Sequence, residues 1–254
     1  MHRNAVKLLY FRSALPGNTY MDRSTFAKRV LDYYRSLKLP EKLHGGVVVM
    51  NPYQSPEIKD YVRQFLFKFF SDNRKRVLVF GINPGRFGAG ITGITFTDPV
   101  ALEIFCGISN TLPKRREVSS EFVYDFAQRW GGPARLYKDF FLTAVSPLGF
   151  VKNGVNFNYY DHPAFLEMIK PFLVESIRSQ LALGGSNKAA IVLGSGKNKA
   201  VFEELNREYK FFKTVYVLEH PRFIMQYRRR ILEKYLQKYH QVFTQALTHG
   251  VFGS

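Results

Sequence analysis

One stretch limits the possible folds of this chain more than any other: the apolar run RVLVFGI at residues 76–82 and the loop that follows it to residue 96. Residues 77–82 have no polar face, which is typical of a central parallel strand that is covered on both sides. Residues 77–96 include five glycines, and glycines let a backbone come close to a ligand. The stretch has no lysine for a phosphate and no histidine or cysteine for a metal. It therefore predicts a loop that binds a ligand of another kind.

The rest of the chain alternates short apolar runs with longer segments of helical period. Strands are expected at residues 45–50, 76–82, 140–148, 189–194 and 213–220, and helices at 24–37, 55–70, 98–105, 119–130, 163–183, 197–208 and 223–247. This alternation predicts an α/β fold of three layers, with a central, mainly parallel sheet flanked by helices on both faces. Ligands bind such sheets beyond the carboxyl ends of the strands. We therefore expect the glycine loop and the segment HPRF at 220–223 to face one crevice.

Length and charge narrow the function. The 254 residues are predicted to form one domain, with a helical N-terminal extension at about residues 1–44. A net charge of +17 favours a polyanionic partner, first nucleic acid and second an anionic membrane surface. A basic surface that serves only solubility is the alternative. No apolar run is long enough to span a bilayer and no signal peptide is evident, so we expect a cytoplasmic protein.

The sequence argues against a metal site and a nucleotide site. One cysteine, and six histidines without a metal-binding spacing, predict no bound metal. The segment GAGITG at 88–93 matches a dinucleotide-binding pattern, but no helix is expected to open at its last glycine. The segment LGSGKNK at 193–199 resembles a phosphate loop, yet Asn198 replaces the serine or threonine that would hold magnesium. We interpret it as a tight turn from a strand to a helix.

The loop GINPGRFGAGITGITF at 81–96 resembles the first signature motif of the uracil-DNA glycosylase superfamily. It is most similar to a bacterial subgroup of the single-strand-selective monofunctional branch. Eight positions match the motif of that branch without a gap: Asn83, Pro84, Gly85, Phe87, Gly88, Thr92, Gly93 and Phe96. The second motif of the superfamily begins with His-Pro after a late strand, as His220 and Pro221 do here. Weaker similarity covers roughly residues 45–245.

The resemblance implies a DNA glycosylase that excises uracil, and other deaminated bases such as xanthine, to leave an abasic site. Such an enzyme flips the nucleotide into a pocket. Asn83 would position the attacking water, and His220 would hydrogen-bond the base oxygen that gains negative charge. The remaining residues expected around the base are Ile82, Gly85, Phe87 and Phe96, of which Phe96 would stack on it. Without the resemblance, Asn-Pro-Gly is an ordinary turn and Phe96 an ordinary core residue.

No metal, cofactor or lysine nucleophile is required if the water attacks directly, so the resemblance implies a monofunctional enzyme that works as a monomer on DNA. The start of the last predicted helix adds apolar side chains and arginines, which suit a wedge and phosphate contacts. The predicted DNA-binding residues are Arg222, Phe223, Arg228, Arg229 and Arg230. The alternative is a helix with an apolar stripe at Ile224, Tyr227, Ile231 and Tyr235 and a solvated basic face.

One position departs from the family. The strand before Pro147-Leu148 carries an asparagine there that reads the edge of uracil, and this chain has Ala144. Asn156 is the candidate to supply a carboxamide instead. Strict uracil recognition is therefore in question. The other two readings are a mismatch-specific uracil or thymine glycosylase, whose first motif also reads GINPG, and a domain of the same fold that binds nucleic acid without catalysis.

Overall fold

The central sheet has four parallel strands in the order β4-β3-β7-β8. The structure is a computed structural model that describes residues 24–40, 42–43 and 45–252, so most of the predicted N-terminal extension lies outside the described residues. The strands are β3 (Arg76–Gly81), β4 (Phe140–Ala144), β7 (Gly185–Leu193) and β8 (Thr214–Leu218). Every residue of β3 and β4 is buried, as the continuous apolar run predicts for strands covered on both faces.

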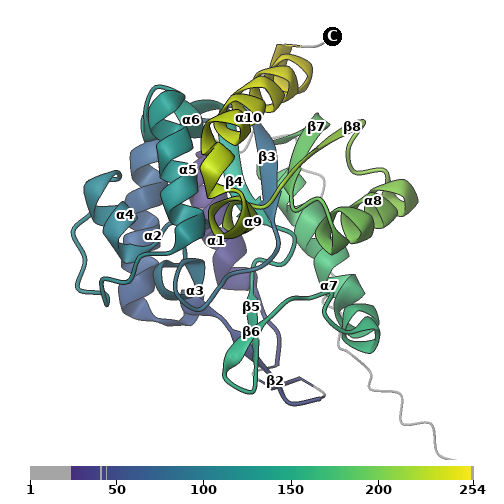
Figure 1. The fold of residues 1–254 in the computed structure, drawn as a ribbon. Coiled ribbons are helices and arrows are strands. Elements are labelled where there is room, and N and C mark those ends of the chain that lie inside the picture. The colour runs from purple at the N-terminus through teal and green to yellow at the C-terminus, as the bar shows by residue number, and fades with distance from the viewer. Residues whose placement is uncertain (1–23, 41, 44, 253–254) are drawn as a thin grey trace, which may run out of the picture.

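Helices cover the two faces of this sheet, and the predicted three-layer α/β fold is confirmed. Figure 1 shows α2 (Pro56–Phe69), α5 (Val118–Arg129) and α6 (Pro133–Asp139) to one side of the sheet, and α7 (Pro163–Ala182) and α8 (Lys197–Tyr209) to the other. Helix α1 (Phe26–Ser36) packs against α2. The short helices are η1 (Pro52–Gln54), α3 (Ala89–Thr92) and α4 (Pro99–Ile104). Within the described part of the chain, no helix is long and apolar enough to cross a membrane.

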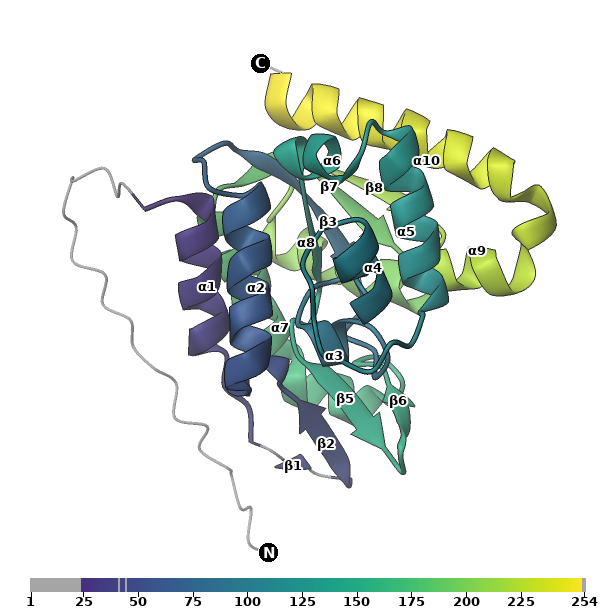
Figure 2. The ribbon, with the colours of Figure 1, turned by 90° about the vertical axis from the view of Figure 1, so that its left-hand side faces the viewer.

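A second, antiparallel sheet lies below the central one in Figure 2. It comprises β1 (Lys42–Leu43), β2 (Val47–Met50), β5 (Gly149–Lys152) and β6 (Val155–Phe157), in the order β1-β2-β5-β6. The β5–β6 hairpin is absent from the sequence prediction, although its turn carries the dipeptide Asn153-Gly154. Both turn residues have positive φ, at 50° and 73°, which a two-residue type I′ turn requires.

The strand predicted at 140–148 is shorter than expected, because β4 ends at Ala144. The backbone N–H groups of Val145 and Ser146 still donate to Gly81 and Ile82. The Ser146 hydroxyl then donates to the carbonyl of Leu148, which turns the chain out of the central sheet and into β5. The second sheet therefore begins where the carboxyl ends of β3 and β4 stop.

The single helix predicted at 223–247 is wrong. The chain forms α9 (Pro221–Tyr227), η2 (Arg229–Ile231), α10 (Leu232–Leu247) and the π-helical turn η3 (Thr248–Phe252). Arg228 interrupts the helix, with φ −131° and ψ 16°. The break exposes two members of the expected apolar stripe, since Tyr227 is 66% and Ile231 47% exposed. Helix α9 instead packs on α5, as Figure 2 shows.

Candidate active site

Asn83 lies two residues beyond the end of β3, and backbone groups hold both ends of its side chain. The carboxamide oxygen accepts a hydrogen bond from the N–H of Tyr159 at 3.3 Å. The amide nitrogen donates to the carbonyls of Phe157 at 3.3 Å and Pro84 at 3.4 Å. A backbone donor and backbone acceptors therefore fix the orientation of the amide. The oxygen keeps a second lone pair with which it can hold a water.

The partner of Asn83 is itself anchored. The Tyr159 ring is fully buried, and its hydroxyl donates to the Asn198 side chain at 2.5 Å. Asn198 in turn donates to the carbonyl of Leu193 at 3.0 Å. Residues 194–196 link β7 to α8, so LGSGKNK is the strand-to-helix turn that the sequence predicts. Asn198 stands where a phosphate loop would bind magnesium, and here it supports the segment that orients Asn83.

His220 lies beyond the carboxyl end of β8 and begins α9. Its Nδ1 accepts a hydrogen bond from the N–H of Arg222 at 3.2 Å, so the neutral ring carries its proton on Nε2. Burial and then the positive charge of Arg222 lower the pKa of His220 to about 4. The imidazole is therefore neutral near pH 7, and its Nε2–H is a hydrogen-bond donor without a net charge.

Phe96 lies beside His220, with the two ring centroids 5.7 Å apart. Its backbone adopts φ 56°, a left-handed conformation that is costly for a bulky residue. Thr92 holds it there, because its hydroxyl donates to the carbonyl of Thr97 at 2.6 Å and accepts from the N–H of Ile94 at 3.1 Å. A Cβ on Gly81 would lie 2.8 Å from the Phe96 ring, so the glycine at the end of β3 admits this ring.

Three other predicted residues of the base site differ from one another in burial: Ala144, Ile82 and Phe87. Ala144 is buried and is the register partner of Gly81, so its methyl group lies on the same face of the sheet as Phe96. Ile82 is half-buried at the end of β3. Phe87 is 39% exposed, and the guanidinium groups of Arg86 and Arg115 lie 5.0 and 5.2 Å from its ring centre. Phe87 is thus at the rim rather than in the interior.

The carboxyl group of Glu117 also reaches the glycine loop, which the sequence analysis missed. A methyl group added to Gly88 would collide with it. Burial, followed by the negative charge of Asp98, raises the pKa of Glu117 to about 7, and the positive charge of Arg222 opposes this. One signal was available. Glu117 takes the N-cap position of α5 without capping it, although Ser119 and Ser120 follow and serine is a preferred N-cap.

Asn156 lies next to the same loop. Its side-chain oxygen accepts a hydrogen bond from the N–H of Arg86 at 3.0 Å. The amide nitrogen lies 3.5 Å from the point that a Cβ on Gly85 would occupy. Gly85 and Asn156, two predicted residues of the base site, therefore lie close together. The β5–β6 hairpin places Asn156 there.

The predicted DNA-binding side chains form the outer edge of this region, and all are exposed: Arg222, Phe223, Arg228, Arg229 and Arg230. The Arg228 guanidinium lies 5.3 Å from the ring centre of Phe223. Arg229 pairs with Glu121 of α5 at 2.6 Å. An exposed ion pair contributes at most about 1 kcal/mol, so Arg229 is free to exchange Glu121 for a phosphate.

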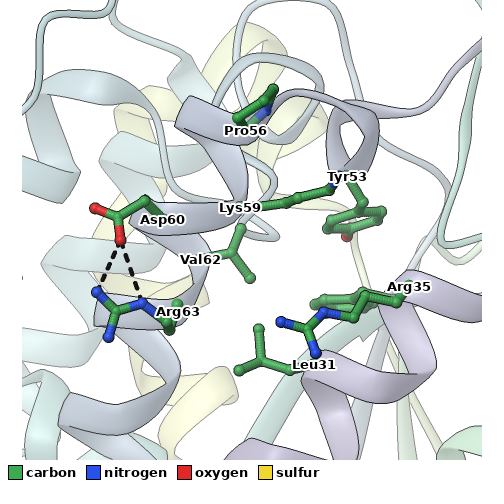
Figure 3. A pocket seen from close by; sticks show the side chains of 9 residues that line it. Leu31, Arg35, Tyr53, Pro56, Lys59, Asp60, Val62 and Arg63 are labelled. Atoms are coloured by element: carbon green, nitrogen blue, oxygen red, sulfur yellow. Dashed lines mark hydrogen bonds and ion pairs between the residues drawn. The ribbon is translucent and has the colours of Figure 1, made fainter.

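A cavity of about 200 Å³ lies elsewhere, between α1 and α2. Figure 3 shows its lining, which includes the cations Arg35, Lys59 and Arg63. None of its lining residues belongs to the predicted site. No cluster of three or more His, Cys, Asp and Glu side chains that could hold a metal occurs at residues 24–40, 42–43 and 45–252.

The site thus combines an oriented neutral carboxamide beyond the carboxyl end of β3, a neutral imidazole donor beyond that of β8, and the ring of Phe96 beside the imidazole. The profile of the uracil DNA glycosylase superfamily matches residues 67–244. The crystal structure of wild-type SMUG2 from Pedobacter heparinus is similar to this chain, with a TM-score of 0.84 and 39% sequence identity. The similarity covers 87% of this chain and 97% of that one. No curated protein matches the chain. The resemblance stated from the two motifs is confirmed.

Proposed function

The chain belongs to the uracil DNA glycosylase superfamily, and from that premise we propose that it is a monofunctional DNA glycosylase of base excision repair. It hydrolyses the N-glycosidic bond of uracil in DNA and leaves an abasic site. Neither motif contains a lysine that would form a covalent intermediate. The proposal therefore has water as the nucleophile and no lyase step, and it requires no metal or cofactor.

The observation that carries the proposal is the fixed carboxamide of Asn83. A protein that only bound nucleic acid would have no use for a neutral group held by a backbone donor and two backbone carbonyls. In a glycosylase this group holds a water against the anomeric carbon of the flipped nucleotide. The amide oxygen accepts a hydrogen bond from that water and orients its lone pair toward the sugar.

His220 serves the other side of the breaking bond. As the bond lengthens, its electrons move into the base and negative charge grows on a base oxygen. A donor already in place stabilises that charge without reorganisation. The Nε2–H of His220 is such a donor, because Nδ1 is occupied by the N–H of Arg222. Phe96 offers a face on which the flipped base stacks, 5.7 Å from the imidazole between ring centres.

The base range extends beyond uracil in this proposal. Ala144 has no group with which to read a base edge, and its methyl group leaves more room than an asparagine. Xanthine has a uracil-like arrangement of oxygens on its six-membered ring, so it is the second substrate that we propose. The protein acts on DNA as a monomer, with one domain, in the cytoplasm. Gel filtration of the purified protein at micromolar concentration tests the monomeric state.

The test is excision from oligonucleotides that carry one uracil, xanthine, hypoxanthine or 5-hydroxymethyluracil, in single strands and in duplexes. Alkaline treatment cleaves the strand wherever a base has been removed. We expect strand cleavage for uracil and for xanthine, and only after alkali, because a monofunctional enzyme does not cut the backbone. Cleavage before alkali contradicts the monofunctional mechanism. Binding without excision of any of the four bases favours a non-catalytic domain.

A further inference from the structure

The Glu117 carboxyl group has no role in the mechanism above, and its surroundings are unusual. It lies against Gly85 and Gly88 of the glycine loop. Within the described ranges of the chain, no residue donates a hydrogen bond to it. Its backbone is held firmly, because the Glu117 N–H donates to the Asp98 carboxylate at 2.8 Å. The side chain is half-buried rather than sealed from solvent, so a ligand can reach this carboxyl group, for which no protein donor competes.

A second polar group converges on the same point. The oxygen of Asn156 is occupied by the N–H of Arg86, so the Asn156 amide nitrogen is the end that faces Gly85. The position of a Cβ on Gly85 lies 3.5 Å from this nitrogen and 3.4 Å from Oε1 of Glu117. Two hydrogen-bonding groups from different elements, β6 and the start of α5, thus border the space over a glycine of the first motif.

The surroundings of Glu117 raise its pKa to about 7, so about half of the carboxyl groups are neutral at pH 7. Removal from water disfavours the carboxylate most strongly, the Asp98 carboxylate adds to this, and Arg222 on α9 opposes it. The other charged side chains on these segments contact other residues, although the Nε of Arg86 is buried without a hydrogen-bond partner. Arg86 and Arg115 flank Phe87, and Glu121, one turn along α5, pairs with Arg229. A neutral carboxyl group is a hydrogen-bond donor, as is the Asn156 amide.

Resting on the proposed function, we propose that Glu117 determines which bases the site accepts: its protonated carboxyl group donates to N7 of a flipped 6-oxopurine, and the Asn156 amide donates to the adjacent O6. These two atoms form the acceptor pair by which guanine is read in the major groove, and xanthine and hypoxanthine share them. Uracil presents an oxygen to the Asn156 amide and a C–H group to Glu117, so the ionisation of Glu117 breaks no hydrogen bond to uracil.

The proposal predicts a pH effect that is confined to purines. Ionised Glu117 is a pure acceptor, so it repels the lone pair of N7. With a pKa of about 7, the neutral fraction falls roughly thirty-fold between pH 6 and pH 8.5. Glu117→Gln keeps a neutral donor of nearly the same shape at every pH. It therefore retains oxopurine excision at pH 8.5, where the wild type loses most of it.

The experiment measures single-turnover excision of uracil, xanthine and hypoxanthine by the wild type and by Glu117→Gln at pH 6 and pH 8.5. For each base the ratio of the two rates cancels any ionisation of the base itself. We expect the wild-type to Gln ratio to fall roughly thirty-fold for the oxopurines with rising pH and to stay constant for uracil. Glu117→Ala lowers oxopurine excision at pH 6, where the wild-type carboxyl group is mostly neutral. Glu203→Gln, an exposed carboxylate paired with Lys199 on α8, is the matched control.

Three outcomes overturn the assignment or its premise. If uracil is excised and the ratio of wild-type to Glu117→Gln rates for the oxopurines does not change with pH, Glu117 only supports the loop. Excision of uracil with no excision of either oxopurine shows that the two donors do not read a purine. No excision of any base by the wild type contradicts the proposed glycosylase function itself. Thermal unfolding of each variant shows whether a lower rate comes from a missing donor or from an unfolded protein. If Glu117→Ala does not fold, the comparison of the wild type with Glu117→Gln is sufficient for the test.

Discussion

The candidate site has two halves, one that follows β3 and one that follows β8, and they differ in how firmly their side chains are fixed. The half that follows β3 is fixed: Asn83 is bonded to backbone groups at both ends of its amide, and the Phe96 backbone is held at φ 56°. The half that follows β8 is fixed at His220 and by the buried residues Pro221, Ile224 and Met225 of α9. Beyond His220, α9 and η2 expose Phe223, the three arginines at 228–230 and Ile231 to solvent.

This difference fits the two tasks that we propose for these residues. A group that positions a water against one carbon atom must be accurate to within a fraction of an ångström, so backbone bonds hold it. Groups that contact phosphates along a flexible strand gain from long side chains that can adjust. We therefore expect substitutions in the first half to change the chemical step and substitutions in the second half to change binding.

The largest effect is expected from Asn83→Ala. Loss of the water-positioning group should lower the single-turnover rate of uracil excision by roughly 10³–10⁴-fold, the upper part of the range for a positioned side chain. Binding to uracil-containing DNA should change little, because the exposed arginines remain. Asn153→Gly is the matched control, since it removes a carboxamide from the β5–β6 turn and keeps the positive φ. A near wild-type rate for Asn83→Ala contradicts its proposed role.

His220→Ala should follow, with a loss of roughly 10²–10³-fold in single-turnover rate, the usual effect of one missing oxyanion donor. Because burial lowers the pKa of His220 to about 4, the imidazole stays neutral from pH 6 upward. Wild-type uracil excision should therefore show no step between pH 6 and pH 8 from this group. His162→Ala removes an exposed histidine that caps nothing and should leave the rate unchanged. A loss below tenfold in His220→Ala reduces His220 to a structural role.

Ala144→Asn should shift selectivity rather than rate. A bidentate contact to a base edge is worth about 1–3 kcal/mol of discrimination, so the ratio of uracil to xanthine excision should rise roughly ten- to a hundredfold. Ala144→Val adds similar bulk without an amide. If both variants raise the ratio equally, steric exclusion of xanthine explains the change and base reading by the amide does not.

The smallest effect on the chemical step is expected in the second half. Replacing Arg228, Arg229 and Arg230 with Gln should leave saturated excision nearly intact but flatten the salt dependence of DNA affinity. The slope of log affinity against log salt should decrease by about one unit for each phosphate contact removed. Replacing Arg35, Lys59 and Arg63, which line the cavity of Figure 3, removes the same charge from the opposite side of the molecule. An equal change in both triple variants means that only net charge matters.

The sequence predicts the first half better than the second, for a physical reason. The apolar run at β3 and the glycines after it specify their conformation locally, so the strand and the loop could be predicted from the residues themselves. The break at Arg228 is not local. Helical period continues through it, and only packing of α9 on α5 and of α10 on α5 and β7 makes the chain turn there.

Glu117 and Tyr159 show a second limit. Both reach the site from elements that lie far from the two motifs in sequence, so no spacing rule could place them. Tyr159 contacts Asn83 through its backbone N–H. Because almost every residue type has this group, the sequence does not indicate the contact. The dipeptide Asn153-Gly154 indicates the β5–β6 hairpin. Without that hairpin in the prediction, the hydrogen bonds of Asn83 to Phe157 and Tyr159 could not be expected. The N-cap mismatch at Glu117 was the only local sign of that residue's position.

The bonds that orient Asn83 join residues 74 and 76 positions apart along the chain. Contacts between such distant residues form late in folding, because the entropy of closing a long loop must be overcome first. Helices and the turn at Asn153-Gly154 can form early without producing an oriented carboxamide. A nascent or partly unfolded chain therefore carries the full basic charge, and can adhere to DNA, before it acquires the geometry for hydrolysis. Recovery of excision after refolding should accordingly trail the recovery of helical signal.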